Sequence, residues 1–209
     1  YRLLSNVLIR DTTNYDICRI LMKPTREQQR ALFSSIFEDI LKLDCRESEI
    51  EEISTGLFPL HPMAVPALIK VSELVAQNER TVFTFLNDHS QDTNRLGDEV
   101  IGFAKFIELT SVEKDKSVKY FTTAEVFDYF ADSLEEDPNN KDVSKIVMAY
   151  RQLSPNLNCE EKRVLKTIAL LEAIGDQNLR PSRENIVKCF EFTEITKKRV
   201  EQIIDKMHA

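Results

Sequence analysis

The sequence predicts a mainly α-helical protein, and three observations support this class. The chain of 209 residues has only four Gly and no Trp, with 42% hydrophobic and 30% charged residues, which is typical of globular proteins built largely from helices. Apolar residues recur at helical spacing along several segments. Helix-capping patterns precede several of these segments. We expect two helical lobes, residues 1–155 and 156–209, divided near Pro155.

The clearest helix predicted in the first lobe covers residues 25–43. Thr25-Arg26-Glu27-Gln28 has the capping-box pattern, in which the Thr hydroxyl and the Gln side chain satisfy reciprocal backbone donors. Behind it, six apolar residues recur on one helical face. They are Leu32, Phe33, Ile36, Phe37, Ile40 and Leu41. Residues 1–24 give a weaker signal, and the acidic stretch 47–52 is interpreted as a connector.

Two prolines, Pro59 and Pro62, interrupt the helical pattern and predict an extended segment before a new helix. Apolar positions continue from Pro62 to Leu74, and a second apolar stretch follows at 82–86, which predicts a helix, a short break and another helix. We interpret residues 87–98 as a loop. Residues 99–119 combine an apolar patch around 101–109 with a charged stretch at 111–119.

Further capping patterns divide the rest of the chain. Thr122-Thr123-Ala124-Glu125 repeats the capping box and predicts a helix, and the next helical face, around residues 146–150, is ended by Pro155. Three capped helices are then predicted in residues 156–209. Asn158-Cys159-Glu160-Glu161 caps the first, Pro181-Ser182 opens the second, and Thr193 or Thr196 caps the third. This succession favours a helix-turn-helix or winged-helix domain, although the chain ends before the strands of a wing.

The charge distribution limits where nucleic acid could bind. The net charge of −7 argues against a footprint over the whole surface. Residues 156–209 contain ten Lys or Arg and nine Asp or Glu, whereas residues 1–155 carry a net charge of −8. Lys197, Lys198 and Arg199 open the last predicted helix, where cations oppose the macrodipole unless an anion is near. Two alternatives stay open: a DNA phosphate, or a protein carboxylate such as Glu194 or Glu201.

No pattern in the sequence predicts catalysis or a metal site. The four Cys and three His are dispersed, which favours free thiols in a reducing cytoplasm. The segment 97–104 has the glycine spacing of a phosphate-binding loop, but Phe103 and Ala104 replace its Lys and Ser/Thr. No apolar run reaches the roughly 18 to 20 residues of a membrane span, and the first residues do not show the charged, apolar and small-residue blocks of a signal-peptide pattern. We therefore expect a soluble, cytoplasmic protein without a membrane partner.

Two stretches resemble a known signature. They are L-F-P-L-H-P at residues 57–62 and A-Q-N-E-R-T-V-F-T-F-L at residues 76–86. Together they resemble large bacterial ATP-binding proteins of the AAA+/STAND type, some of them associated with phage defence and restriction. The segment F-T-T-A-E-V-F-D-Y-F at residues 121–130 is similar to their downstream T-x-x-x-L-x-D-Y-F pattern. The three-helix end is similar to the winged helix that follows, so the resemblance covers roughly residues 50–209.

The resemblance implies a nucleotide-sensing role. Residues 1–155 would be a helical lid-like region of a P-loop ATPase, with an insertion at about 99–119, and residues 156–209 a winged-helix-like domain. Arg80, framed by Asn78 and Glu79, would approach the terminal phosphate of ATP. The phosphate-binding core, outside this chain, would be the partner that holds the ATP, so the chain alone is not expected to hydrolyse it.

Other interpretations remain open from the residues alone. The chain opens at Tyr1 and stops on a helical pattern at Ala209, so we expect it to be a piece of a longer protein. A helical protein-interaction or adaptor module without nucleotide fits the composition as well. A free-standing winged-helix transcription regulator is a third interpretation, weakened by the net charge. In these alternatives, Arg80 would pair with a local carboxylate.

Overall fold

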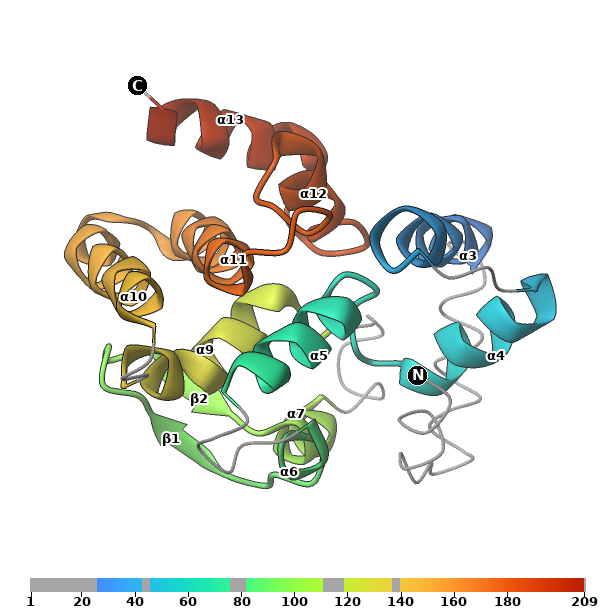
Figure 1. Ribbon diagram of the computed structural model, residues 1–209, viewed down its shortest axis with the longest axis horizontal. Helices are drawn as coiled ribbons and strands as arrows, with labels where there is room; N and C mark the ends of the chain where they lie inside the picture. Colours follow the sequence, from blue (N-terminus) through green and yellow to red (C-terminus); the bar gives the residue numbers. More distant parts are fainter. Residues whose placement is uncertain (1–25, 43–45, 76–81, 111–118, 137–139, 209) are drawn as a thin grey trace.

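Helices make up most of the computed structural model, which describes residues 26–42, 46–75, 82–110, 119–136 and 140–208 (Figure 1). The helices are α3 (Arg26–Ser35), continued by the π-helical η2 (Ile36–Ile40), α4 (Glu47–Leu57), α5 (Ala64–Leu74), α6 (Val82–Leu86), α7 (Phe103–Leu109), α9 (Thr123–Glu135), α10 (Lys141–Leu153), the 3-10 turn η4 (Ser154–Asn156), α11 (Cys159–Ile174), α12 (Arg183–Lys188) and α13 (Lys197–His208). The strands β1 (Gln91–Thr93) and β2 (Glu99–Ile101) form an antiparallel hairpin. The mainly α class predicted from the sequence is confirmed.

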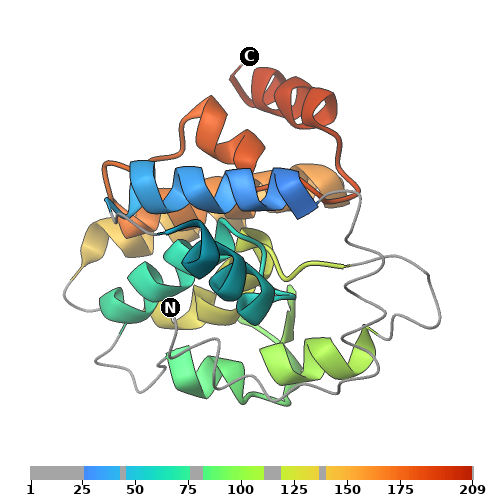
Figure 2. The same cartoon turned by 90° about the vertical axis from the view of Figure 1, so that its right-hand side faces the viewer.

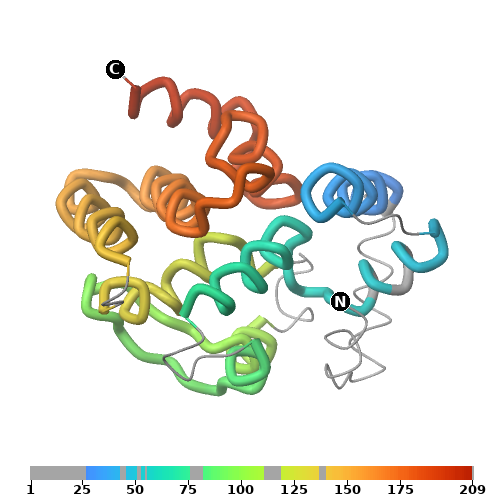
Figure 3. The backbone as a smooth tube through the Cα atoms, viewed as in Figure 1, coloured from blue at the N-terminus to red at the C-terminus, as the bar shows by residue number. Residues whose placement is uncertain are grey.

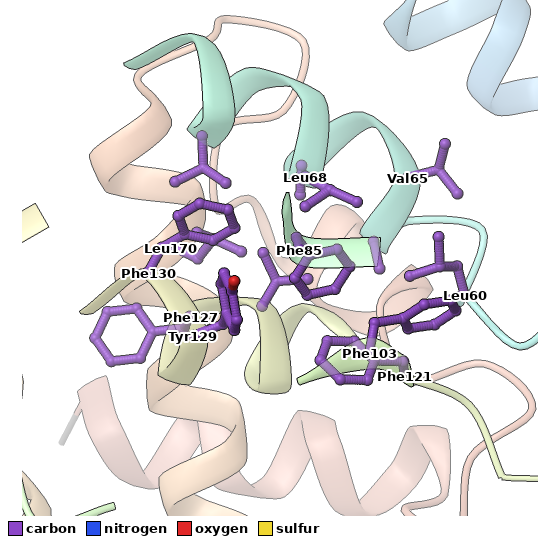
Figure 4. Close-up of a cluster of buried hydrophobic side chains, with 14 of the residues drawn as sticks. Leu60, Val65, Leu68, Phe85, Phe103, Phe121, Phe127, Tyr129, Phe130 and Leu170 are labelled. Atoms are coloured by element: carbon purple, nitrogen blue, oxygen red, sulfur yellow. The ribbon is translucent and has the colours of Figure 1, made fainter. Parts of the chain in front are cut away.

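The main hydrophobic core lies where α5, α9 and α11 pack together (Figure 1). Aromatic residues from several elements fill it, and Figure 4 shows their rings meeting beneath α5. The ring of Phe85 is central, because its centroid lies 4.9 Å from that of Tyr129 and 5.2 Å from that of Phe121, both edge-on. Such contacts stabilise the core beyond the apolar area that they bury.

A second apolar cluster joins the C-terminal helices to the N-terminal part of the described chain. Its buried residues are Leu32, Ile36, Ile40, Met63, Val164, Leu171, Leu179, Ile186, Cys189, Phe190, Ile195, Val200, Ile203 and Ile204. Helix α11 contributes to both cores, with Leu170 in the first and Leu171 in the second. The boundary near Pro155, between 1–155 and 156–209, stays a prediction, and this second apolar cluster contains residues from both ranges, including Leu32 of α3.

Two groups of helices lie at opposite ends of the molecule along the vertical direction of Figures 1 and 2. Figure 2 shows α13 at one end and the pair α6 and α7 at the other, with α3 crossing between them. Figure 3 shows the last helix, α13, running along the edge of the molecule. No helix among the described residues combines the length and apolar character needed to cross a membrane.

The capping patterns predicted most of the helix starts correctly. The box of Thr122 and Glu125 opens α9, and that of Asn158 and Glu161 opens α11, with both reciprocal bonds formed. Ser182 caps α12 by accepting a hydrogen bond from the N–H of Asn185. At the start of α13, the hydroxyl oxygen of Thr196 accepts from the N–H of Arg199 at 3.3 Å. Thr25, the expected cap of α3, lies outside the described residues.

Two elements differ from the sequence prediction. Residues 47–52, expected as a connector, are the first half of α4, whose box joins Arg46 and Glu49 and whose Ile50 and Ile53 are buried. Residues 87–98, expected as a loop, contain β1 of the hairpin. The three helices predicted in 156–209 are present, and their winged-helix arrangement stays a prediction.

Candidate functional site

The residues assigned to nucleotide sensing by the resemblance, Asn78, Glu79 and Arg80, lie in the segment 76–81, outside the described residues. The helices on both sides of this segment are described. Helix α5 packs against α9 and α11, and α6 packs against α5 and α7. The two points that the segment connects are therefore fixed by the main core.

The residues next to this segment differ in exposure. Val75 and Phe85 are buried, while Phe83 is 48% exposed. A shallow, open surface depression lies beside α6. It is lined by Phe83, Thr84, Asn87, Asp88 and His89. The surface of α6 thus presents a ring and several polar groups next to the segment that carries Arg80.

His61, the histidine of the stretch 57–62, is fully buried and joins distant parts of the chain. The backbone N–H of Met63 donates to its Nδ1 at 3.2 Å, so Nε2 carries the proton and donates to the carbonyl oxygen of Glu191 at 2.7 Å. Burial lowers the pKa of His61 to about 4, against the opposing effect of the bond to Glu191. The neutral ring therefore links the start of α5 to the connection between α12 and α13.

Three aromatic rings surround this link, and with His61 they form what we call the aromatic junction: Phe58, His61, Tyr120 and Phe192. The ring of Tyr120 lies 5.7 Å from the rings of both His61 and Phe58, and edge-on to both. The ring of Phe192 lies 6.4 Å from those of His61 and Tyr120. Gln29 of α3 donates to the Tyr120 hydroxyl at 2.6 Å. The junction thus holds together three separate parts of the chain, and Gln29 links α3 to it as a fourth.

The predicted nucleic-acid residues lie in the first turn of α13, but their environments differ. The Nε–H of Arg199 donates to Glu160 of α11 at 2.6 Å, so an internal carboxylate meets this guanidinium. Lys197 and Lys198 are exposed and form no ion pair with the described residues. Glu194, which the sequence suggested as their neutralising partner, pairs with Arg163 instead.

Sequence reasoning missed a buried charge cluster, which we define as Asp98, Asp128, Tyr150 and Lys166. The ammonium nitrogen of Lys166 lies 2.7 Å and 2.9 Å from the two carboxylate oxygens of Asp128, and 3.4 Å from Oδ1 of Asp98. The Tyr150 hydroxyl donates to Oδ2 of Asp98 at 2.7 Å. One ammonium thus serves two carboxylates inside the protein.

Burial controls the electrostatics of this cluster. It raises the pKa of Asp128 to about 7, against the opposing attraction of Lys166, and Asp98 adds to the rise. Burial and the bond to Asp98 also raise the pKa of Tyr150, which keeps its hydroxyl protonated. With two carboxylates and one ammonium, the cluster is neutral only when it holds one extra proton.

Hydrogen bonds of the hairpin turn, together with the charge cluster, attach the hairpin to α9 and α11. Asn94, in the hairpin turn, accepts from the N–H groups of Leu96 and Asp98 at 3.0 Å, and its amide donates to the carbonyl oxygen of Asp128 at 3.2 Å. The N–H of Arg95 donates to Asp132 of α9 at 3.0 Å. The turn therefore lies on α9 through polar contacts, with Asp98 reaching the lysine of α11.

A partial signal for this cluster was present in the sequence. Asp128 stands between Phe127 and Tyr129, within the run of apolar residues of α9, where a carboxylate needs a buried partner. The identity of the partner, Lys166, follows from the packing of α9 on α11 and could not be read from spacing.

Among the described residues, no group of three or more His, Cys, Asp or Glu is arranged to hold a metal ion. The chemical features of the described chain are thus a neutral buried histidine, a buried charge cluster and an exposed pair of lysines. No family model, curated protein or solved structure matches the chain.

Proposed function

We propose that this chain is the nucleotide-sensing lid and winged-helix portion of a P-loop ATPase whose phosphate-binding core lies outside it. The observation that carries the proposal is the sequence N-E-R-T-V-F-T-F-L at residues 78–86, with the stretch 57–62 before it. Support comes from the helices on either side of residues 76–81, since both are held by the main core. A guanidinium can engage two phosphate oxygens at once, in a bidentate geometry.

The triphosphate itself would have to be held by the core of the parent protein. The glycine pair Gly97 and Gly102, which has the spacing of a phosphate-binding loop, belongs to the hairpin and to the start of α7. Phe103, at the position of the loop's Lys, is fully buried. We therefore expect the chain alone to bind ATP weakly or not at all in calorimetry, and micromolar affinity would contradict the proposal.

Hydrolysis by the parent protein tests the role of Arg80. We expect Arg80→Ala to lower kcat for ATP by about a hundred-fold or more, because a guanidinium on the terminal phosphate stabilises the charge that develops in the transition state. The melting temperature should hardly change.

The matched control for this experiment is Arg95→Ala. It removes an exposed arginine that pairs with Glu136 on the surface, so hydrolysis should stay at the wild-type rate. Normal hydrolysis by Arg80→Ala, or unfolding of that variant, would leave Arg80 a structural residue. The helical protein-interaction module would then be the better interpretation of the chain.

For α13 we propose a more limited role. Any phosphate contact of its first turn would be made by Lys197 and Lys198, because Arg199 is engaged with Glu160. Titration of duplex DNA at two salt concentrations tests this role. If DNA binds there, Lys197→Ala with Lys198→Ala should reduce the salt dependence by about two phosphate contacts, and Arg199→Ala should leave it nearly unchanged. Equal salt dependence in all three proteins would remove this turn from any DNA contact.

A further inference from the structure

We propose that the connection between α12 and α13, residues 189–196, is a conformational hinge for α13. We propose that His61 holds this connection in the conformation seen in the structure. A displacement of the segment before α5 would then be transmitted to the C-terminal helix. This goes beyond the proposed function, because it requires neither a nucleotide nor the missing core.

The conformation of Phe192 identifies the hinge. Its φ of +63° places a bulky residue in the left-handed region, which L-residues other than Gly, Asn and Asp seldom occupy. Such a conformation costs free energy and persists only where the surrounding contacts enforce it. The direction of the chain into α13 depends on this angle.

His61 holds the peptide plane between Glu191 and Phe192, whose orientation relative to the Phe192 Cα is set by this angle. The carbonyl oxygen of Glu191 belongs to the same peptide plane as the N–H of Phe192, and Nε2 of His61 donates to that oxygen at 2.7 Å. Turning the plane to a negative φ would break this bond. Because His61 is fully buried, water could not replace the lost partner without opening the junction.

Ring packing adds a second restraint on the same residue. The side chain of Phe192 lies against His61 and Tyr120, and it also packs on the second apolar cluster. Thr193 closes the turn locally, since its hydroxyl donates to the carbonyl oxygen of Phe190 at 2.8 Å. The hydrogen bond of Thr193 stabilises a turn at this point in the chain. The contacts of Phe192 with His61 and Tyr120 determine the conformation that this turn adopts.

The other end of the link is anchored near α5. The backbone N–H of His61 donates to the carbonyl oxygen of Phe121 at 2.9 Å, and Leu60 forms a parallel bridge with Phe121. The carbonyl oxygen of His61 accepts from the N–H of Ala64, the first residue of α5. His61 cannot move without the start of α5, so it is a positioning residue for residues 189–196.

Amide hydrogen exchange on the full chain tests the proposal. His61→Leu replaces the imidazole by an apolar side chain of similar size and so removes the Nε2–H donor. We expect exchange at residues 190–196 and in the first turn of α13 to accelerate about ten-fold or more, with α9 and α10 unchanged. His61→Gln, which retains an N–H donor, should restore part of the protection. His89→Leu, on an exposed histidine, is the matched control and should change nothing in this region.

A double-mutant cycle with Phe192→Gly separates the hinge from a general loss of stability. Glycine adopts a positive φ without strain, so the hinge should no longer depend on His61. His61→Leu should then accelerate exchange at residues 190–196 far less than it does in the wild type. Additive effects in the cycle would overturn the proposal. Acceleration spread evenly over α5, α9, α11 and α13 would overturn it as well, and so would exchange that stays at wild-type rates.

Discussion

At the scale of single residues, the surroundings of Gly102 leave no room for a side chain. A β-carbon added there would lie 2.3 Å from the carbonyl oxygen of Asp88, so the backbone between α6 and the hairpin would have to move. We predict that Gly102→Ala lowers the free energy of unfolding by about 3 kcal/mol, measured by urea denaturation.

Gly97 provides the control for this prediction. Its φ of +82° disfavours a side chain, but a β-carbon would meet no atom within 4 Å. Gly97→Ala should therefore cost about 1 kcal/mol, from conformation alone. If the two variants were equally destabilised, the close approach of Gly102 to Asp88 would not contribute to stability.

We expect substitutions within the charge cluster to lower the free energy of unfolding by unequal amounts. Lys166→Met would leave Asp98 and Asp128 buried without a cation, so we expect the free energy of unfolding to fall by about 3 to 5 kcal/mol. Asp128→Asn keeps the pair of Lys166 and Asp98 and should cost clearly less. Lys145→Ala, which removes an exposed lysine paired with Asp142, should have no measurable effect. Equal losses for Lys166→Met and Asp128→Asn would contradict the shared use of one ammonium.

Two buried groups should make stability depend on pH in opposite directions. The pKa of His61 is lowered from 6.5 to about 4. The contribution of this histidine to the free energy of unfolding, on the order of 3 kcal/mol, is therefore fully present above pH 6.5 and is lost as pH falls through 4. The pKa of Asp128 is raised from 3.8 to about 7, so its contribution is present below pH 3.8 and is lost as pH rises through 7.

Variants separate these two effects. Relative to the wild type, Asp128→Asn should lose more stability between pH 7.5 and pH 4.5, because the opposing gain is gone. His61→Gln should lose less over the same interval. Urea denaturation at several pH values gives both slopes, and parallel curves for the three proteins would refute both assignments.

At the scale of elements, the helices with strong local signals were predictable. Apolar periodicity gave α3, and capping boxes gave α9 and α11, because these signals act within one or two turns. The acidic stretch of α4 was misread, although Glu47 and Glu49 favour a helix start through the macrodipole. The hairpin was missed because its strands have three residues each and β1 is exposed throughout, so no alternation marks it.

The cap of α11 allows a test of this local account. Asn158 accepts from the N–H of Glu161 at 3.0 Å, while its own N–H donates to the Glu161 carboxylate at 3.1 Å. We predict that Asn158→Ala lowers the free energy of unfolding by about 1 kcal/mol, and that Asn158→Ser restores most of it. A variant as stable as the wild type would show that tertiary packing alone fixes this helix start.

At the scale of the whole molecule, the sites depend on contacts that no local pattern contains. The bond from His61 to Glu191 spans 130 residues of sequence, and Lys166 of α11 meets Asp98 of the hairpin, with α7, α9 and α10 between them in the sequence. The sequence marked His61 only as part of a stretch that resembles a family, and Asp128 only as a carboxylate in an apolar run. Which groups they meet follows from the packing of α9, α11 and the C-terminal helices.

The central claim, that Arg80 senses the terminal phosphate of ATP, is tested most directly by affinities for two nucleotides. A protein that contains this chain together with the proposed ATP-binding core would be titrated with ADP and with a non-hydrolysable ATP analogue, as wild type and as Arg80→Ala. We predict that Arg80→Ala weakens binding of the ATP analogue about ten-fold or more and leaves the Kd for ADP unchanged, because only the analogue carries the terminal phosphate. An unchanged ratio of the two affinities would contradict the claim.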